Sequence, residues 1–249
     1  MTITSPQNEK LKLVRRLARR RRRDAEGLFV AEGEDLLDAA RSAGAEPVEL
    51  LSAAGDDLGG DEVEPALLDG VSALGSGARV IGVWRERWAS AIDPPCLYLH
   101  GISDPGNVGT IIRTAAALVG GTVALGPGCA DPYGPRAVRA SMGAIFFQPV
   151  ARAEPGETPG PRAALVAHGG MPLEALGSPA TLCMGSERDG LPGSVLADCE
   201  QRVTIALRPG AESLNVAAAA AIAMQRISSP GSAKMAPLAD ESSAENDDG

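Results

Sequence analysis

The sequence predicts an α/β protein with two domains, and three observations lead to this prediction. The chain has 249 residues, which suffices for one large domain or two modest ones. In its second half, short apolar segments alternate with glycine-containing loops and helical patterns, as in a parallel sheet covered by helices. Its first third carries a smaller α/β pattern behind a basic segment. We therefore expect a small N-terminal domain over 1–83, a linker over 84–95 and a larger domain over 96–228.

The composition is that of a globular chain without a membrane-spanning segment. Hydrophobic residues make up 44% of the sequence and charged residues 22%, a balance that allows a sizeable core. No apolar run approaches the ~20 residues that a transmembrane helix requires. The N-terminus lacks the order of basic, apolar and small residues that marks a secretory signal. We expect a soluble, cytoplasmic protein with no membrane partner.

Cysteine and histidine are too sparse to predict metal chemistry. No CxxC pair occurs among the four cysteines, Cys96, Cys129, Cys183 and Cys199. Cys96, Cys183 and Cys199 are interpreted as reduced core residues. The two histidines, His100 and His168, are far apart in the sequence, so no metal site is predicted.

The charge is distributed unevenly along the chain. The net charge of −9 by itself argues against an RNA-binding protein. Residues 1–30, however, contain nine Lys and Arg against three Asp and Glu, whereas residues 31–93 contain four against fourteen. A basic N-terminal segment therefore precedes an acidic body. Such a segment can be a solvated face, a membrane-surface helix or a phosphate-binding surface.

The elements of the first domain follow from its pattern. Leu11, Val14, Leu17 and Ala18 recur at helical spacing, so we predict one amphipathic helix over 9–23 whose remaining surface carries arginines. Short apolar segments predict strands, and a longer one predicts a helix. The strands are expected over 28–31, 47–52 and 79–84, and the helix over 33–43.

The second domain repeats the order strand, loop, helix. Strands are expected over 97–100, 122–125, 165–167, 181–184 and 203–207. One helix is expected over 108–119, and a last helix over 214–227 is apolar nearly all round. A helix without a polar face must be buried on more than one side. Residues 229–249 carry too little apolar surface to fold and are predicted as a disordered acidic tail.

Three polar loops follow predicted strands of this domain, over 103–114, 184–192 and 208–216. Open α/β sheets bind ligands at the carboxyl ends of their strands, and glycine lets the backbone approach a ligand closely. Neither GxGxxG nor GxxxxGK[ST] is present, so a dinucleotide or ATP site is disfavoured. The three loops are therefore predicted to bind a ligand that is neither a dinucleotide nor ATP.

The three loops resemble the motifs of the SpoU/TrmH-type RNA 2'-O-ribose methyltransferases of the SPOUT superfamily. The matching segments, in the family's order, are DPGNVGTIIRTA (104–115), GSERDGLP (185–192) and SLNVAAAAAI (213–222). The first domain is similar to the substrate-binding domain of the members that act on ribosomal RNA. The resemblance implies a C-terminal methyltransferase domain folded as a trefoil knot, a rare exception to unknotted topology. It also implies a homodimer and S-adenosylmethionine bound in the knot.

The resemblance assigns roles to particular residues. It implies that Arg113, Glu187, Ser213 and Asn215 are catalytic, with Arg113 as a fixed cation that stabilises a developing alkoxide. From the local pattern alone, Ser213 could instead cap a helix and Asn215 could lie in its first turn. The positions that match the cofactor-lining residues of the family are Gly185, Ile205 and Leu214.

RNA contact is expected from Asn107 and from four arginines of the basic segment, Arg15, Arg19, Arg22 and Arg23. Asn107 has a second interpretation as the N-cap of its helix. For the arginines, the neighbouring methyltransferase pattern favours phosphate contact over a solvated or membrane-surface face. Aromatic residues are only 3% of the chain, so recognition is expected to rest on RNA shape and backbone.

Together these features predict an S-adenosylmethionine-dependent methyltransferase that acts on a ribose 2'-hydroxyl, with 23S-type ribosomal RNA as the expected substrate. One alternative is the same reaction on transfer RNA, which favours basic terminal helices around a bare catalytic domain; the region 28–83 argues against it. A second alternative is a non-catalytic RNA-binding factor in ribosome assembly. The intact motif residues argue against that one.

Overall fold

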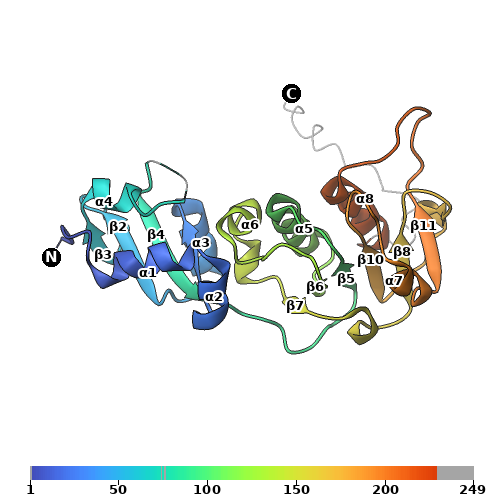
Figure 1. Ribbon diagram of the computed structural model, residues 1–249, viewed down its shortest axis with the longest axis horizontal. Coiled ribbons are helices and arrows are strands. Elements are labelled where there is room, and N and C mark those ends of the chain that lie inside the picture. Colours follow the sequence, from blue (N-terminus) through green and yellow to red (C-terminus); the bar gives the residue numbers. More distant parts are fainter. Residues whose placement is uncertain (1, 74, 76, 229–249) are drawn as a thin grey trace, which may run out of the picture.

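The computed structural model describes residues 2–73, 75 and 77–228; the expected acidic tail over 229–249 lies outside them. The described chain forms a four-stranded and a seven-stranded sheet, one in each half of the sequence. The two halves lie side by side along the long axis of the molecule (Figure 1). This arrangement confirms the predicted α/β class with a smaller N-terminal domain.

The N-terminal domain is a small mixed sheet covered by helices. Its strands pair in the order β1-β4-β2-β3, and only β2 and β3 run parallel to each other. Its strands are β1 (Leu28–Glu32), β2 (Glu49–Ala53), β3 (Asp61–Val63) and β4 (Val80–Arg85). Its helices are α1 (Glu9–Leu17), α2 (Arg20–Glu26), α3 (Glu34–Ser42) and α4 (Pro65–Asp69).

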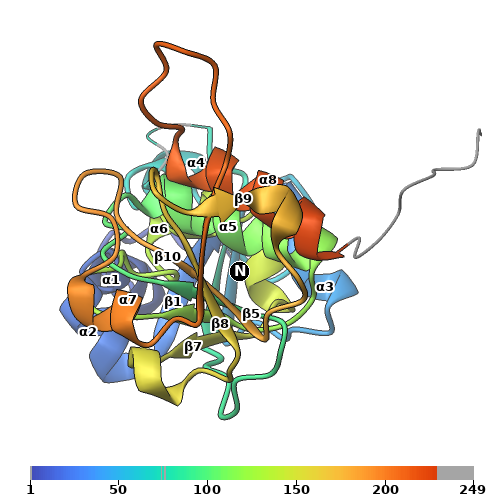
Figure 2. The ribbon, with the colours of Figure 1, turned by 90° about the vertical axis from the view of Figure 1, so that its right-hand side faces the viewer.

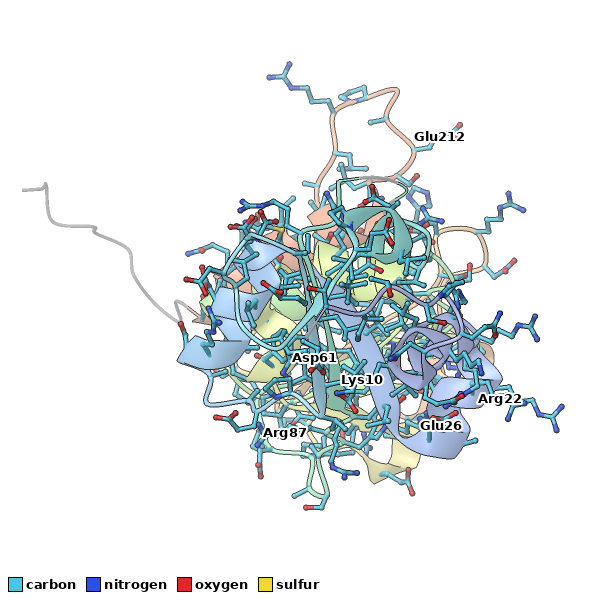
Figure 3. All side chains as sticks on the ribbon, turned by 90° about the vertical axis from the view of Figure 1, so that its left-hand side faces the viewer. Lys10, Arg22, Glu26, Asp61, Arg87 and Glu212 are labelled. Carbon is cyan, nitrogen blue, oxygen red and sulfur yellow. The ribbon has the colours of Figure 1, made fainter. Side chains whose placement is uncertain are left out.

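Helix α1 is anchored by both its apolar and its polar face. Leu11, Val14 and Leu17 are buried in the core of the N-terminal domain. On the polar face, Lys10 pairs with Asp61 and, at 2.6 Å, with Glu49 (Figure 3 labels Lys10 and Asp61). The hydrogen bonds from Lys10 to these two carboxylates raise the pKa of Lys10. The amphipathic pattern of this segment is thus realised over its first half.

The predicted single helix over 9–23 was wrong, because the chain breaks it at Ala18 and Arg19. Arg19 has an extended backbone, and α2 then begins at Arg20 in a new direction. The guanidinium of Arg23, from α2, donates to the last carbonyl oxygens of α1, to Leu17 at 2.7 Å and to Ala18 at 3.1 Å. The break therefore satisfies carbonyl groups that a helix end leaves without partners.

The C-terminal domain is a parallel sheet, as predicted. All its strand pairs run parallel, in the order β7-β6-β5-β10-β8-β11-β9. The strands are β5 (Cys96–Leu99), β6 (Val123–Leu125), β7 (Val150–Arg152), β8 (Arg162–Leu165), β9 (Met171–Pro172), β10 (Thr181–Met184) and β11 (Gln201–Thr204). Strands β7 and β9 were not predicted: β9 has only two residues, and β7 is a three-residue strand that ends in the exposed Arg152. The trefoil knot stays a prediction of the family resemblance.

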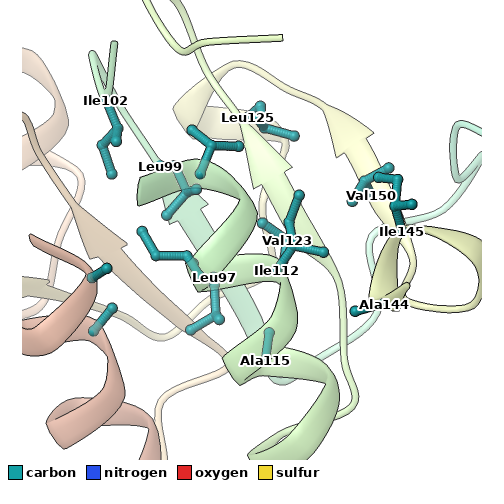
Figure 4. Close-up of a cluster of buried hydrophobic side chains, with 14 of the residues drawn as sticks. Leu97, Leu99, Ile102, Ile112, Ala115, Val123, Leu125, Ala144, Ile145 and Val150 are labelled. Carbon is teal, nitrogen blue, oxygen red and sulfur yellow. The ribbon is translucent and has the colours of Figure 1, made fainter. Parts of the chain in front are cut away.

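Helices cover this sheet and fill its core. Helix α5 packs against both α6 and α8. Ile112 and Ala115 of α5 lie over Leu97 of β5 and Val123 of β6, and all four are buried (Figure 4). The helices are α5 (Pro105–Leu118), α6 (Pro135–Ala140), α7 (Gly193–Ala197) and α8 (Val216–Ser228), with short turns η1 (Ala144–Phe146), η2 (Pro155–Glu157) and η3 (Leu173–Ala175). Within the described ranges, no helix has the length and apolar character to cross a membrane.

A cluster of aromatic side chains joins the two domains. The chain has three Phe, two Trp and two Tyr. Five of these seven meet here: Phe29, Trp84, Trp88, Tyr133 and Phe146, with ring centroids 4.9–6.3 Å apart. Trp84 lies in β4, so the sheet extends into the linker predicted over 84–95. The domains are therefore packed through a shared core.

The segment after β4 is fixed by Tyr133. The Tyr133 hydroxyl donates to the carbonyl oxygen of Arg87 at 2.8 Å and accepts from its backbone N–H at 2.9 Å. Burial raises the pKa of Tyr133, so the phenol stays neutral and can donate. Ala89 continues the attachment, because its N–H donates to the Val150 carbonyl at 2.7 Å. Residues 86–89 thus pack on the C-terminal domain.

Candidate active site

Two of the three predicted ligand loops, 184–192 and 208–216, line a cleft at one edge of the parallel sheet, and the third, 103–114, contacts it through the hydrogen bond from Asn107 to Glu187. Strands β10, β8 and β11 are neighbours, and the loops that leave their carboxyl ends surround a cleft of about 530 Å³. The loop between β11 and α8 stands out from the body of the molecule (Figure 2), and Glu212 marks it in Figure 3. Carboxyl ends of parallel strands are where α/β sheets bind ligands. The cleft is therefore the candidate site.

The three residues predicted to line the cofactor, Gly185, Ile205 and Leu214, all line this cleft. The volume lies within the range of about 300–1,000 Å³ that small-molecule sites have. Apolar side chains shape much of the walls, including Leu165, Leu191, Ile205, Leu207 and Leu214. Apolar walls with exposed backbone groups suit a ligand that contains a flat aromatic base.

Gly185 is required by the turn that forms one wall. The backbone groups of Ser186 and Gly190 exchange hydrogen bonds of 3.2 and 3.0 Å, which closes a tight turn over 187–189. A Cβ on Gly185 would lie 2.1 Å from the carbonyl carbon of Gly190. Any larger residue at 185 would therefore push the turn open.

Side chains from all three motifs meet in one hydrogen-bonded chain. The side-chain amide of Asn107, on α5, donates to Oε1 of Glu187, which lies 80 residues away in the sequence. The side-chain oxygen of Asn107 accepts from Nδ2 of Asn215 at 3.1 Å. Glu187 also lines the cleft. We call this chain, Glu187–Asn107–Asn215, the motif bridge.

The structure corrects which residues cap the two helices of the site. The N-cap of α5 is Asp104, whose carboxylate accepts from the Asn107 N–H at 2.9 Å, so Asn107 is not the cap. The helix accordingly begins at Pro105 rather than near Val108. Helix α8 is capped by Asn215, whose side-chain oxygen accepts from the Ala217 N–H at 2.9 Å. Ser213 instead lines the cleft.

Arg113 is placed apart from the other predicted catalytic residues. It lies farther along α5 on the exposed face of the helix and is not among the residues that line the cleft. The opposite face of α5 is buried through Val108, Ile111, Ile112 and Ala115. Within one chain, the structure therefore brings together Glu187, Asn215 and Ser213, and leaves Arg113 on the neighbouring surface.

Three of the four arginines expected to contact RNA lie on the surface of the N-terminal domain. They are Arg15, Arg19 and Arg22, and Figure 3 shows Arg22 pointing away from the molecule. Arg15 also donates to the Pro6 carbonyl oxygen at 2.8 Å. Their exposure leaves them available to an anionic partner.

Arg23 is a correction to that set, because it is buried. Its side chain is 5% exposed and pairs with Asp131 of the C-terminal domain, whose side chain is 8% exposed. Nε and Nη2 of Arg23 lie 3.0 and 2.7 Å from Oδ2 of Asp131. With Nη1 bonded to the end of α1, this guanidinium has no face left for a phosphate. Arg23 joins the domains instead.

Sequence reasoning missed part of the cleft wall. Residues 166–169, which include His168, follow β8 and line the cleft, although they lie outside the three predicted loops. Arg188 and Glu212 also line it; they lie inside two of the predicted loops but were not named as site residues. The position of residues 166–169 could have been predicted from the sequence. A strand was expected over 165–167, and the carboxyl end of a parallel strand lies at the ligand-binding edge of the sheet. In the described part of the chain, no group of three or more His, Cys, Asp or Glu is placed to hold a metal ion.

Two segments of the chain match known protein families. Residues 94–225 match the model of the SpoU rRNA Methylase family, and residues 8–87 match the MRM3-like substrate binding domain. The chain belongs to the SpoU rRNA methylase family. Its two matched segments lie on either side of residues 88–93, and the three motifs fall inside the SpoU segment.

Individual relatives of the SpoU family extend the match to nearly the whole chain. The 23S rRNA (guanosine(2553)-2'-O)-methyltransferase of Bacillus subtilis is 30% identical over 88% of this chain and 96% of its own length. An AdoMet-bound rRNA methyltransferase structure from Sinorhizobium meliloti superposes with a TM-score of 0.81 at 27% identity, covering 92% of this chain and 97% of that one.

The match to other SpoU relatives is shorter. An uncharacterised tRNA/rRNA methyltransferase of Mycobacterium bovis is 40% identical over 140 residues, which is 50% of this chain. The matched segment spans about half of that relative, 48% of its length.

Proposed function

We propose that this chain transfers the methyl group of S-adenosylmethionine to a ribose 2'-hydroxyl of RNA, and that the RNA is of the 23S ribosomal type. The observation that carries the proposal is the motif bridge. It joins Asn107, Glu187 and Asn215, which the sequence separates by up to 108 residues, at the border of a cofactor-sized cleft. Side chains gathered from three separate motifs at one sheet edge are typical of an active site.

The cleft fits S-adenosylmethionine in size and character. Its volume of about 530 Å³ and its apolar walls at Ile205 and Leu214 suit an adenine ring, while the turn after Gly185 offers backbone groups. When bound, S-adenosylmethionine supplies a methyl group activated by its positively charged sulfur. The protein's task is to align the ribose oxygen with that carbon and to favour loss of the hydroxyl proton.

The residues of this chain can perform that task. Glu187 and Asn215 are held in fixed positions by Asn107, so the groups that face the ribose are preorganised before RNA binds. We assign Ser213 and Asn215 to orienting the ribose. We assign Arg113 to stabilising the negative charge that develops on the 2'-oxygen as its proton leaves.

The position of Arg113 supports a homodimer as part of the proposal. Arg113 lies outside the cleft wall of its own chain. In the proposed homodimer, Arg113 of one chain lies against the cleft of the other. Helix α8 buries Val216, Ala220, Ala223 and Met224 within the chain, yet leaves Ile222 44% exposed. An apolar side chain beside small alanines is suited to a closely packed two-fold interface.

Ribosomal RNA is favoured over transfer RNA by the N-terminal domain. Residues 8–87 match the MRM3-like substrate binding domain, and the similar Bacillus subtilis protein is a 23S rRNA (guanosine(2553)-2'-O)-methyltransferase. A bare catalytic domain flanked by basic helices, as the transfer RNA alternative expects, does not describe this chain.

The test is methyl transfer from tritiated S-adenosylmethionine to unmodified transcripts of 23S ribosomal RNA, 16S ribosomal RNA and transfer RNA. We expect label in the 23S transcript, at a ribose that becomes resistant to alkaline cleavage. Asn107→Ala should lose activity because it breaks the motif bridge. Label confined to transfer RNA would replace the proposed substrate, and binding without any transfer would make the chain a non-catalytic RNA-binding factor.

A further inference from the structure

A second cleft lies between the two domains, away from the cofactor cleft. Its volume is about 510 Å³, and we call it the interdomain cleft. Arg20 of α2 forms its N-terminal side, and Trp88 of the connecting segment also lines it. The loop 125–130 and the chain that follows β7, including Arg152, complete it. It therefore opens at the carboxyl ends of β6 and β7.

A preformed stack of two planar groups lines this cleft. The guanidinium carbon of Arg152 lies 4.2 Å from the centroid of a Trp88 ring. Trp88 is held in place by a hydrogen bond of 2.8 Å from its Nε1 to Glu86 and by an edge contact with Tyr133 at 5.1 Å. Because Arg152 covers the Trp88 ring and is itself 55% exposed, its outer face presents a flat cation to the cleft.

The cations of the interdomain cleft are positioned by one carboxylate. Asp24 pairs with Arg152 at 2.8 Å and with Arg20 at 3.7 Å. Arg20 is 58% exposed, so it can accept a further anionic partner. Two acids, Glu154 and Glu157, also line the cleft, and the carboxylate of Glu157 accepts from the Glu154 N–H at 2.7 Å. A flat face and an exposed cation side by side suit a nucleotide.

The interdomain cleft is connected to the cofactor cleft along the sheet edge. Its loop 125–130 bonds to the loop after β5, through Gly101 N–H to the Pro127 carbonyl and Ala130 N–H to the Ile102 carbonyl, both at 2.9 Å. The loop after β5 lines a third hollow of about 490 Å³, which shares residues 186–190 with the cofactor cleft. The three hollows thus follow one another along the edge.

The spacing of the strands sets the distance between the two clefts. From β6 to β8 there are three strand spacings of about 4.8 Å, roughly 15 Å in total. An RNA strand laid along this edge would therefore place two sites a few nucleotides apart in the same chain.

We propose that the interdomain cleft binds a nucleotide of the substrate RNA, a few nucleotides from the methylated ribose. The base stacks on the outer face of Arg152, as bases do on guanidinium planes, and the phosphate contacts Arg20. This inference rests on the proposed function, since it extends the same RNA-binding surface. It assigns one RNA contact jointly to the two domains, which the aromatic cluster packs together.

The experiment separates stacking from charge with two variants and a matched control. Arg152→Lys keeps the charge and removes the planar group, whereas Arg20→Gln removes a charge. The control is Arg41→Gln, which also removes an exposed charge. Within the described part of the chain, the Arg41 side chain donates hydrogen bonds only to Asp38 and to the carbonyl oxygen of Leu58. Filter binding of each protein to an unmodified 23S ribosomal RNA transcript is measured across a salt series, and thermal melting verifies folding.

We expect Arg152→Lys to bind about tenfold more weakly with an unchanged salt slope. Arg20→Gln should lower the slope of log affinity against log salt by roughly 0.7, and Arg41→Gln should match the parent. If the folded Arg152→Lys and Arg20→Gln variants bind as the control does while the parent methylates RNA, the interdomain cleft is not an RNA site. If the parent neither binds nor methylates RNA, the proposed function fails together with this inference.

Discussion

The buried ion pair between Arg23 and Asp131 offers the sharpest test of how the domains are joined. We consider Asp131→Asn, which preserves the shape of the side chain and removes its charge. Arg23 belongs to α2 of the N-terminal domain and Asp131 to the loop after β6 of the C-terminal domain, 108 residues away. The change therefore acts on the domain interface and leaves the cofactor cleft intact.

The expected loss of stability follows from burial. The two side chains are 5% and 8% exposed, so solvent cannot replace the lost carboxylate. Removing one partner of a buried pair costs about 3–5 kcal/mol because a charge stays in a medium of low polarity. Nη1 of Arg23 keeps its hydrogen bonds to the carbonyl oxygens of Leu17 and Ala18. We therefore expect the free energy of unfolding to fall by an amount near the lower value, about 3 kcal/mol. For a chain of this size that corresponds to a melting temperature lower by roughly 6–12 °C.

The assay is urea unfolding at 25 °C, followed by circular dichroism and by tryptophan fluorescence, which reports on Trp84 and Trp88 at the interface. The matched control is Asp38→Asn. Asp38 pairs with Arg41 on the surface, with side chains 73% and 55% exposed. A surface pair of this kind contributes about 0–1 kcal/mol. The double variant Arg23→Leu with Asp131→Leu should lose less than Asp131→Asn, since it buries no lone charge.

A loss of under about 1 kcal/mol for Asp131→Asn, equal to that of Asp38→Asn, would refute the reasoning. Arg23 would then be free to act elsewhere. The same double variant provides a functional check, because a buried Arg23 contributes nothing to phosphate contact. Its slope of log RNA affinity against log salt should equal that of the parent, and a reduced slope would return Arg23 to the RNA-binding set.

Further predictions concern the site and the assembly. Arg113→Ala should lower methyl transfer on the order of a hundredfold or more and leave calorimetric binding of S-adenosylmethionine unchanged; near-normal turnover would remove Arg113 from the mechanism. Gly185→Ala should abolish cofactor binding, because the added carbon would lie 2.1 Å from the carbonyl carbon of Gly190, and a normal dissociation constant would disprove the role of this turn. Neutralising Arg19 and Arg22 together should lower the salt slope of RNA binding by roughly 1.4–1.8 if each contacts a phosphate, and identical slopes would exclude both. Sedimentation equilibrium should give twice the chain mass of 25.4 kDa, and a fully active monomer would contradict the proposed dimer.

The sequence alone predicted the parallel α/β class of the C-terminal domain, five of its seven strands and the sheet edge at which the cleft lies. Alternation of short apolar segments with helical patterns is a local property, and it predicts a parallel sheet with ligand loops at the carboxyl ends of its strands. The three motifs carry the family resemblance because each is a contiguous segment. That resemblance predicts a shared cofactor site for Gly185, Ile205 and Leu214, and all three line the same cleft.

Only the tertiary structure decided what individual polar residues do. Arg22 and Arg23 are identical neighbours in the sequence, yet one is exposed and the other is buried against Asp131. Asn107 bridges motifs because its partners come from distant loops, whereas the nearby Asp104 takes the capping role. A periodic pattern reports which face of a segment is apolar. Which charge that face meets depends on the docking of domains, and that docking is determined by contacts between residues far apart in the chain.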